Sequence, residues 1–141
     1  MLTQTDGKGN VTSFEYNKAN KAIKKIDHGG RLGDPENYSY IWVKVESYTY
    51  YADGSLKDKT DRNGNTTNYT YDVHGRMLSQ SIGGNSTSYT YDNNGNQLSM
   101  TDSTGTTTRA YDELGRVISK TVPQIGTSAY NYDIITGVPE G

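Results

Sequence analysis

The sequence predicts an all-β protein in which antiparallel β-hairpins repeat along a meandering, spiralling sheet. The phrase Tyr-Asp-x-x-Gly begins at Tyr71, Tyr91 and Tyr111, so it recurs every 20 residues. Glycines that end four-residue turns recur about every ten residues, and the short stretches between them are rich in Tyr and Thr, which favour strands. A fixed period near 20 residues indicates a repeat architecture with two chain reversals in each repeat.

Each phrase predicts a strand, a tight turn and a returning strand. Asp72 stands at the first position of a type I turn, where its carboxylate accepts hydrogen bonds from backbone N–H groups further along. Gly75 stands at the fourth position, where a left-handed conformation returns the chain antiparallel. The glycines expected at such positions are Gly54, Gly64, Gly75, Gly84, Gly95, Gly105, Gly115 and Gly126.

The register expected around the first complete phrase follows from this turn. Tyr69 and Tyr71 lie two residues apart and share one face of an extended strand. If the turn is closed by residues 72 and 76, Tyr71 lies opposite Met77 and Tyr69 opposite Ser79, with Leu78 on the other face. A slip of one residue would exchange the faces.

Residues 1–30 are expected to be degenerate repeats. Asp6–Gly9 and Asp27–Gly30 have the composition of turns, and Asn20 occupies a glycine position, which asparagine tolerates. A short helix over Asn17–Ile26 remains an alternative, because Ala and Lys favour helices.

Residues 31–51 are expected to be an aromatic-rich insertion. After a loop at residues 33–37, Tyr38–Tyr51 forms one long strand or two strands joined near residue 46. The even positions carry a candidate ligand or partner surface: Tyr38, Tyr40, Trp42, Tyr48 and Tyr50. Such a surface can stack on sugar rings or anchor a protein partner, and the other interpretation is that it covers the sheet or neighbouring repeats.

Residues 52–127 form the regular repeats, and residues 128–141 are expected to be a truncated repeat. Tyr51 stands where the phrase has Asp. Val122-Pro123 is expected to end a strand, because proline has no N–H to donate. The last phrase opens at Tyr130–Asp133 without a complete returning strand, so we expect the chain to be a fragment of a longer protein.

Each of the three phrases has a hydrophobic residue seven positions after its tyrosine, namely Leu78, Leu98 and Ile118. With these residues, the phrases resemble the repeats of the YD-repeat or RHS-repeat family. The resemblance implies that hairpins join edge to edge into a hollow shell, which encloses a C-terminal effector, often a toxin, in bacterial secreted systems. In the related animal teneurins the shell supports adhesion. The family's Asp-Pro-x-Gly self-cleavage signature is absent, because Asp34-Pro35-Glu36 does not match it.

The resemblance therefore implies a structural role: enclosing or displaying an effector, as part of a larger bacterial protein that is secreted or at the cell surface. The alternative is a carbohydrate- or cell-surface-binding adhesion module. Expected partners are neighbouring repeats, the rest of the parent protein and other copies that pair through bare sheet edges.

Composition argues against several other classes. The 141 residues carry a net charge of −2 and lack a basic stripe, so no nucleic-acid partner is expected. No apolar run approaches a membrane span, and the N-terminus lacks the apolar region of a signal peptide. His28 and His74 sit in expected turns, and turn chemistry explains the clustered Asp and Asn residues. We therefore expect no enzyme, no catalytic residues, no cofactor and no metal site. Hydrophobic residues make up only 31%, yet the small charge and the periodic tyrosines favour order over a disordered linker.

Overall fold

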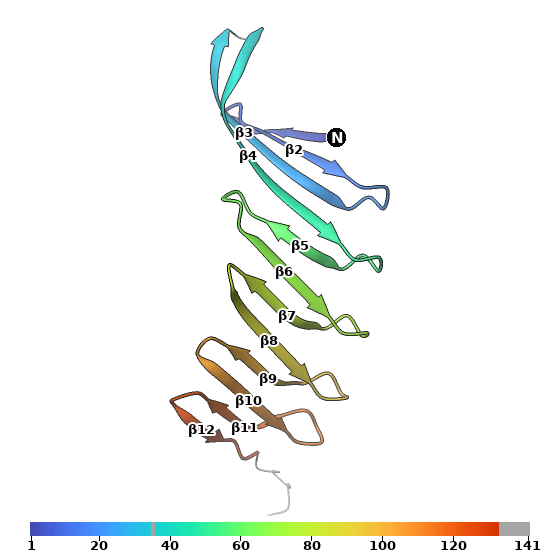
Figure 1. The fold of residues 1–141 in the computed structure, drawn as a ribbon, viewed down its shortest axis with the longest axis vertical. Helices are drawn as coiled ribbons and strands as arrows, with labels where there is room; N and C mark the ends of the chain where they lie inside the picture. The colour runs from blue at the N-terminus through green and yellow to red at the C-terminus, as the bar shows by residue number, and fades with distance from the viewer. Residues whose placement is uncertain (35, 133–141) are drawn as a thin grey trace, which may run out of the picture. The chain divides into compact units, whose positions relative to one another are not determined.

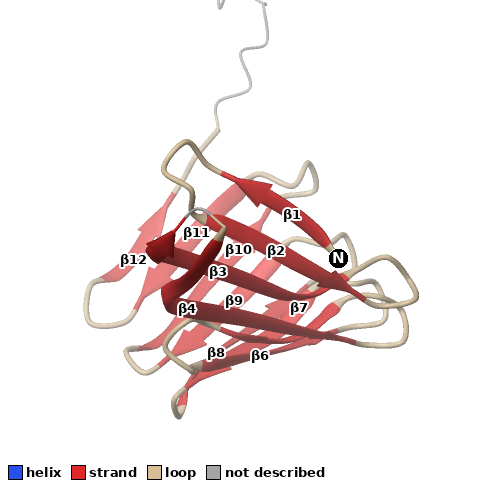
Figure 2. Ribbon diagram, turned by 90° about the horizontal axis from the view of Figure 1, so that it is seen from above, coloured by secondary structure: helices blue, strands red, loops and turns tan. Residues whose placement is uncertain are grey.

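The computed structural model describes residues 1–34 and 36–132, and all of their regular structure is β-strand (Figures 1 and 2). Within each of two compact units the strands adjoin in the order of the chain, and every assigned pair is antiparallel, which confirms the predicted all-β meander. The described residues contain no helix long and apolar enough to cross a membrane. The strands are β1 (Leu2–Thr5), β2 (Val11–Tyr16), β3 (Ala22–Asp34), β4 (Asn37–Tyr50), β5 (Leu56–Thr60), β6 (Thr66–Tyr71), β7 (Met77–Ile82), β8 (Asn85–Tyr91), β9 (Gln97–Asp102), β10 (Gly105–Tyr111), β11 (Val117–Val122) and β12 (Gly126–Ala129).

The chain divides into two compact units, Met1–Gly84 with β1 to β7 and Asn85–Gly141 with β8 to β12. Within each unit, a short turn joins consecutive strands. The predicted turn positions are confirmed, since each has a positive φ: Gly9, Asn20, Gly54, Gly64, Gly75, Gly84, Gly95, Gly105, Gly115 and Gly126.

A β-bulge follows the turn in each hairpin that begins with the tyrosine phrase. Tyr71 lies opposite Met77, as predicted, but Tyr69 lies opposite Gln80 and not opposite Ser79. The prediction for Tyr69 was wrong because the bulge places one extra residue in β7 and shifts the register by one. Equivalent shifts occur at Tyr16, Tyr50, Tyr91 and Tyr111.

The alternation of side chains along a strand gives these hairpins two chemically different faces. In β6, Thr67, Tyr69 and Tyr71 are half-buried, whereas Thr66, Asn68 and Thr70 between them are exposed. On the exposed face the Thr70 hydroxyl lies 2.7 Å from the Ser79 hydroxyl in a cross-strand hydrogen bond. The same kind of hydroxyl pair joins Thr60 to Thr66, Thr90 to Ser99, Thr101 to Thr106 and Thr121 to Thr127.

The described residues bury no hydrophobic side chain. Ser13 and Thr107 are the two buried polar residues of the described chain, and the tyrosines of the repeats keep part of their surface exposed. Hydrophobic burial is the dominant favourable term in folding. Because no hydrophobic side chain of the described residues is fully enclosed, hydrogen bonds and the local chemistry of the turns carry a large share of the organisation of these sheets.

The structure corrects one predicted turn in the N-terminal region. Asp27–Gly30 is not a turn, because β3 continues through it to Asp34 and pairs with the long β4 along almost its whole length. Gly30 still has a φ of 65°, and the chain reverses instead between Asp34 and Asn37. The helical alternative for residues 17–26 is also wrong, since β3 begins at Ala22. Of the two interpretations of residues 38–51, the single long strand is confirmed.

Candidate functional site

The aspartate of the phrase holds its turn through both carboxylate oxygens. Oδ1 of Asp72 accepts hydrogen bonds from the backbone N–H groups of His74 and Arg76, both at 2.9 Å. The Gly75 N–H donates to the Asp72 carbonyl at 3.0 Å, and the Asp72 N–H donates to the Arg76 carbonyl at 2.9 Å. Asp6, Asp61, Asp92 and Asp112 form the same set of bonds. The turn role predicted for the aspartate is therefore confirmed.

The residue after the glycine completes this turn, a role that the sequence analysis missed. The Arg76 Nε donates to Asp72 Oδ2 at 2.6 Å, and the Asn96 Nδ2 donates to Asp92 Oδ2 at 2.9 Å. Burial raises the pKa of the Asp72 carboxyl, but the hydrogen bonds from Arg76 and His74 outweigh it, so the pKa lies below its usual value. The recurrence of Arg or Asn directly after the glycine was the available signal.

The tyrosine of the phrase connects one hairpin to the preceding one. The Tyr111 hydroxyl donates to the Gln97 carbonyl at 2.8 Å, and the Tyr132 hydroxyl donates to the Val117 carbonyl at 2.7 Å. In the first unit the Tyr50 hydroxyl donates to the Ala22 carbonyl at 2.6 Å. Each acceptor lies at the start of a returning strand, six positions after the tyrosine of its own phrase. We call these three bonds the tyrosine staples.

The predicted aromatic surface is divided between two places in the first unit. Tyr48 and Tyr50 lie where β4 pairs with β5, and both hydroxyls are engaged within the protein, the Tyr48 hydroxyl with Glu46 Oε2 at 2.7 Å. Tyr38, Tyr40 and Trp42 lie further along the hairpin. The structure therefore brings these three together and separates them from the other two.

These three aromatic residues lie on a two-stranded arm, formed by residues 29–34 of β3 and 37–42 of β4 (Figure 1). Among the described residues, no other strand pairs with the arm, since β2 reaches only to His28 and β5 begins to pair at Ser47. The Tyr38 and Tyr40 rings meet edge to face at 5.4 Å, and the Arg31 guanidinium lies 4.2 Å from the Tyr38 ring centroid.

The arm also exposes aliphatic side chains. Leu32 and Ile41 in the arm and Val43 at its base have exposed fractions of 70%, 66% and 52%. Trp42 packs on the glycine opposite it, because a Cβ added at Gly29 would lie 2.0 Å from the indole ring. Exposed apolar residues on a strand pair with two open edges form a surface suited to contact with another chain.

A cluster of charged groups crosses β3, β4 and the β5–β6 turn. Arg62 in that turn forms ion pairs with Asp27 of β3 and with Glu46 of β4, the latter at 2.9 Å. Thr12 donates to Asp27 at 2.6 Å. The hydrogen bond from Tyr48 is the main cause that holds the pKa of Glu46 below its usual value. The cluster ties strands far apart in sequence, and every charge in it has an opposite partner.

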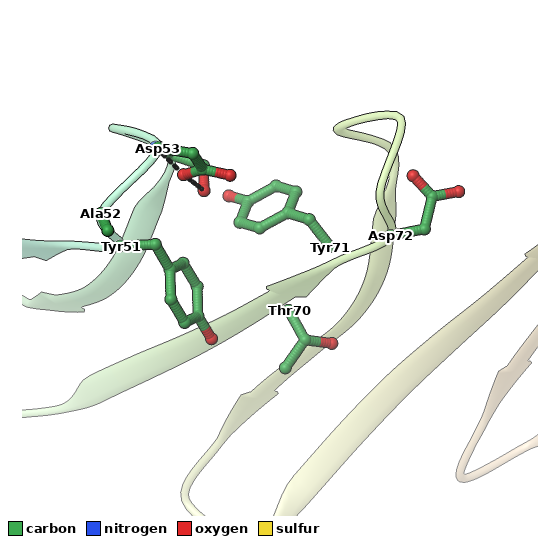
Figure 3. A pocket seen from close by; sticks show the side chains of 7 residues that line it. Tyr51, Ala52, Asp53, Thr70, Tyr71 and Asp72 are labelled. Atoms are coloured by element: carbon green, nitrogen blue, oxygen red, sulfur yellow. Dashed lines mark hydrogen bonds between the residues drawn. The ribbon is translucent and has the colours of Figure 1, made fainter.

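A small open hollow of about 390 Å³ lies beside the β4–β5 turn (Figure 3). It is lined by Tyr51, Ala52, Asp53, Ser55, Thr70, Tyr71 and Asp72. The Tyr51 and Tyr71 rings stand perpendicular, with centroids 6.3 Å apart. The Tyr51 hydroxyl donates to the Tyr69 carbonyl at 2.9 Å, which fixes this ring against β6.

The two histidines lie in different elements of the first unit. His74 lies exposed in the β6–β7 turn, and His28 lies in β3 with its ring 4.9 Å from that of Tyr40. Within residues 1–34 and 36–132, no three His, Asp or Glu side chains gather in a way that could hold a metal ion.

Comparison with solved structures shows a shared fold. The Tc holotoxin pore of Photorhabdus luminescens is 24% identical, with a TM-score of 0.67 over 84% of this chain and 6% of its own. A TcdB2-TccC3 structure without its hypervariable C-terminal region is 24% identical, with a TM-score of 0.68 over 84% of this chain and 6% of its own. The TcdB2-TccC3-Cdc42 structure is 21% identical, with a TM-score of 0.70 over 94% and 8%. This chain thus spans less than a tenth of the length of each of these relatives.

A search of curated proteins finds no match to this chain. The family profile described as teneurin YD-shell matches residues 55–135, which is more than half of the 141 residues. The matched segment contains the three tyrosine phrases, their aspartate turns and two of the tyrosine staples. The chain therefore belongs to the teneurin YD-shell family.

Proposed function

We propose that this chain is a wall segment of a YD-type shell that encloses or displays a polypeptide effector. The observation that carries the proposal is the absence of any buried hydrophobic side chain among the described residues. A sheet without a hydrophobic core of its own exposes both of its faces. It is held together by backbone hydrogen bonds between strands, by the turn carboxylates and by the tyrosine staples, as the wall of a shell would be. The segment has no catalytic role in this proposal, and any enzymatic activity would belong to the effector.

The solved relatives suggest what the shell holds. One is described as a holotoxin pore, and another as lacking a hypervariable C-terminal region. By analogy, we infer that the complete polypeptide is a bacterial protein, secreted or at the cell surface, whose shell holds a variable C-terminal toxin.

Limited proteolysis of the complete polypeptide that carries this segment tests the proposal. The substitution Thr107→Pro removes a ladder donor from the centre of β10, at one of the two buried positions. We expect the effector to be cleaved faster in this variant than in the unaltered protein.

The matched control is Ser103→Pro. Ser103 lies in the β9–β10 turn, at the second position of a type I turn, where proline is favoured. This variant should protect the effector as the unaltered protein does. Equal protease sensitivity of the effector in all three proteins would refute enclosure.

The arm supports a second candidate, carbohydrate or cell-surface binding. Tyr38, Tyr40 and Trp42 lie together on an element that extends beyond its neighbouring strands, and Arg31 adds a charged donor. A glycan array tests this function. Binding that disappears in Trp42→Ala would support it, and absence of binding by the unaltered chain would favour the shell wall alone.

A further inference from the structure

We propose that the hollow beside the β4–β5 turn binds a lysine side chain, with the ammonium group held by Asp53, Tyr71 and the ring of Tyr51. The proposal concerns a site on the wall itself and does not depend on what the shell encloses.

The first support is a departure from the repeat at the hollow. In the other complete phrases an aspartate follows the tyrosine and holds the turn, but here Tyr51 takes that position. The turn is held instead by Asp53, whose Oδ1 accepts from the Ser55 N–H at 2.8 Å and the Ser55 hydroxyl at 2.6 Å. A repeat that replaces its turn-holding residue breaks a local rule, and such exceptions are expected at functional sites.

The second support is that two polar groups at the hollow are unused. Among the described residues, nothing hydrogen bonds to Asp53 Oδ2 or to the Tyr71 hydroxyl. The hydroxyls at the corresponding positions, Tyr50 and Tyr111, form staples. Figure 3 shows the Tyr71 hydroxyl directed toward the Asp53 carboxylate.

The available groups define the chemistry of the ligand. A carboxylate oxygen and a phenol oxygen accept hydrogen bonds, and the face of Tyr51 attracts a cation. An ammonium group has three donors and a positive charge, so it can use all three. Asp72, which also lines the hollow, is already paired with Arg76. Asp53 forms no ion pair among the described residues, although Lys21 is near enough to help lower its pKa, so Asp53 is the carboxylate that supplies charge to a ligand.

Two further observations agree with a cationic ligand. The Lys57 ammonium lies 6.0 Å from the Tyr51 ring centroid, although Lys57 does not line the hollow, so this ring already attracts an ammonium. Burial is the main cause that raises the pKa of the Tyr71 phenol, and Asp53 adds a smaller contribution, so this hydroxyl stays protonated and neutral beside a bound cation. A lysine of a polypeptide that lies against the sheet has the reach to enter an open hollow.

An NMR titration of the full 141-residue chain at low salt tests the proposal. The probes are Nα-acetyl-lysine N-methylamide and Nα-acetyl-norleucine N-methylamide, which has the same aliphatic chain without the ammonium. We expect saturable shifts of the Tyr51 and Tyr71 ring signals and of the Ser55 amide with the lysine probe alone. Equal shifts with the norleucine probe would overturn the proposal.

Substitutions locate the site. Asp53→Asn keeps an oxygen for Ser55 but removes the charge, and we expect it to weaken lysine binding about fivefold, the scale of an exposed ion pair. Tyr71→Phe removes only the unused hydroxyl and should weaken binding by roughly twofold to threefold. It provides an independent readout if Asp53→Asn disturbs the turn.

The matched control is Asp102→Asn. Asp102 accepts from the N–H and hydroxyl of Thr104 at 2.8 and 2.5 Å, which is the geometry of Asp53 and Ser55. Asp102 does not line the hollow beside the β4–β5 turn. This variant should bind the lysine probe normally, and equal affinity of Asp53→Asn and Asp102→Asn would refute the site.

A third probe, n-butylammonium, separates the ammonium from the peptide backbone. Binding comparable to that of the lysine probe supports recognition of the ammonium group. Failure of n-butylammonium to bind, when the lysine probe binds, would overturn the assignment of the hollow to the ammonium.

Discussion

At the scale of the residue, the repeated tyrosine has a specific role that its position explains. Its ring covers one face of the hairpin, and its hydroxyl reaches the carbonyl that begins the returning strand of the preceding hairpin. Phenylalanine would supply the ring but not the bond. The staples therefore give a physical reason for tyrosine at this position in a sheet without a buried hydrophobic core.

We expect Tyr111→Phe to lower the free energy of unfolding by about 1 kcal/mol, because the Gln97 carbonyl loses its partner. Tyr89→Phe is the matched control, since Tyr89 lies on the same face and, among the described residues, its hydroxyl forms no hydrogen bond. Urea denaturation of both variants measures the difference. Equal stabilities would show that the staple contributes nothing.

A second prediction at this scale concerns alkaline pH. Burial and then the hydrogen bond to Glu46 raise the pKa of Tyr48 to about 12, against an unperturbed value of about 10. Because the folded state holds this proton more tightly, the stabilisation is complete below pH of about 10 and is lost as the pH rises through about 12. We expect stability to fall across that interval.

Chemical denaturation at a series of pH values, with phenolate absorbance as the titration signal, measures this loss. In Tyr48→Phe the loss of stability that the ionisation of Tyr48 causes between pH of about 10 and 12 should disappear. Tyr89→Phe serves again as the control and should keep this loss of stability. An unchanged profile in Tyr48→Phe would contradict the assignment.

At the scale of the element, local chemistry made the turns predictable. Asp72 and Gly75 determine their turn within four residues, and Asn20 adopts its φ of 58° for the same local reason. The sequence therefore predicted the hairpins, their order and the position of nearly every reversal.

What the sequence did not predict depends on pairing across strands. The bulge that places Tyr69 opposite Gln80 follows from how β6 and β7 meet, and either register satisfies the pattern of residue types. Gly30 was expected to end a turn, but the long β4 supplies a partner through that position. The hollow joins the Tyr51 turn to Tyr71, 20 positions later. The replacement of aspartate by Tyr51 was visible in the sequence. That it forms a hollow with Tyr71 could be seen only once the pairing of the strands was known.

The arm provides the prediction for this scale. In Gly29→Ala the new Cβ would occupy the place of the Trp42 ring, so the indole must move. Because Trp42 is the only tryptophan, its fluorescence reports this movement directly. We expect a shifted emission maximum and a loss of stability in Gly29→Ala. Gly7→Ala is the control, because no atom lies within 4 Å of a Cβ there. An unchanged spectrum in Gly29→Ala would show that Trp42 does not pack on this strand.

At the scale of the whole molecule, the chain exposes apolar side chains and a strand edge, which most domains cover. Its described residues bury no hydrophobic side chain, and β4 offers an unpaired edge along residues 37–46. Within a shell, neighbouring parts of the protein can cover such surfaces. In the isolated chain the available partner is another copy, because an open strand edge is a template for pairing.

We therefore expect the isolated 141-residue chain to self-associate as its concentration rises, measured by sedimentation velocity. Val43→Lys places a charge on the open stretch of β4, where lysine opposes edge pairing, and should shift the equilibrium toward monomer. Val73→Lys adds the same charge in the β6–β7 turn, at a side chain that is 96% exposed, and should associate like the unaltered chain. Equal effects of the two lysines would indicate that net charge, and not the edge, controls association. A single monomeric species of the unaltered chain at every concentration would contradict the open edge as a site of contact.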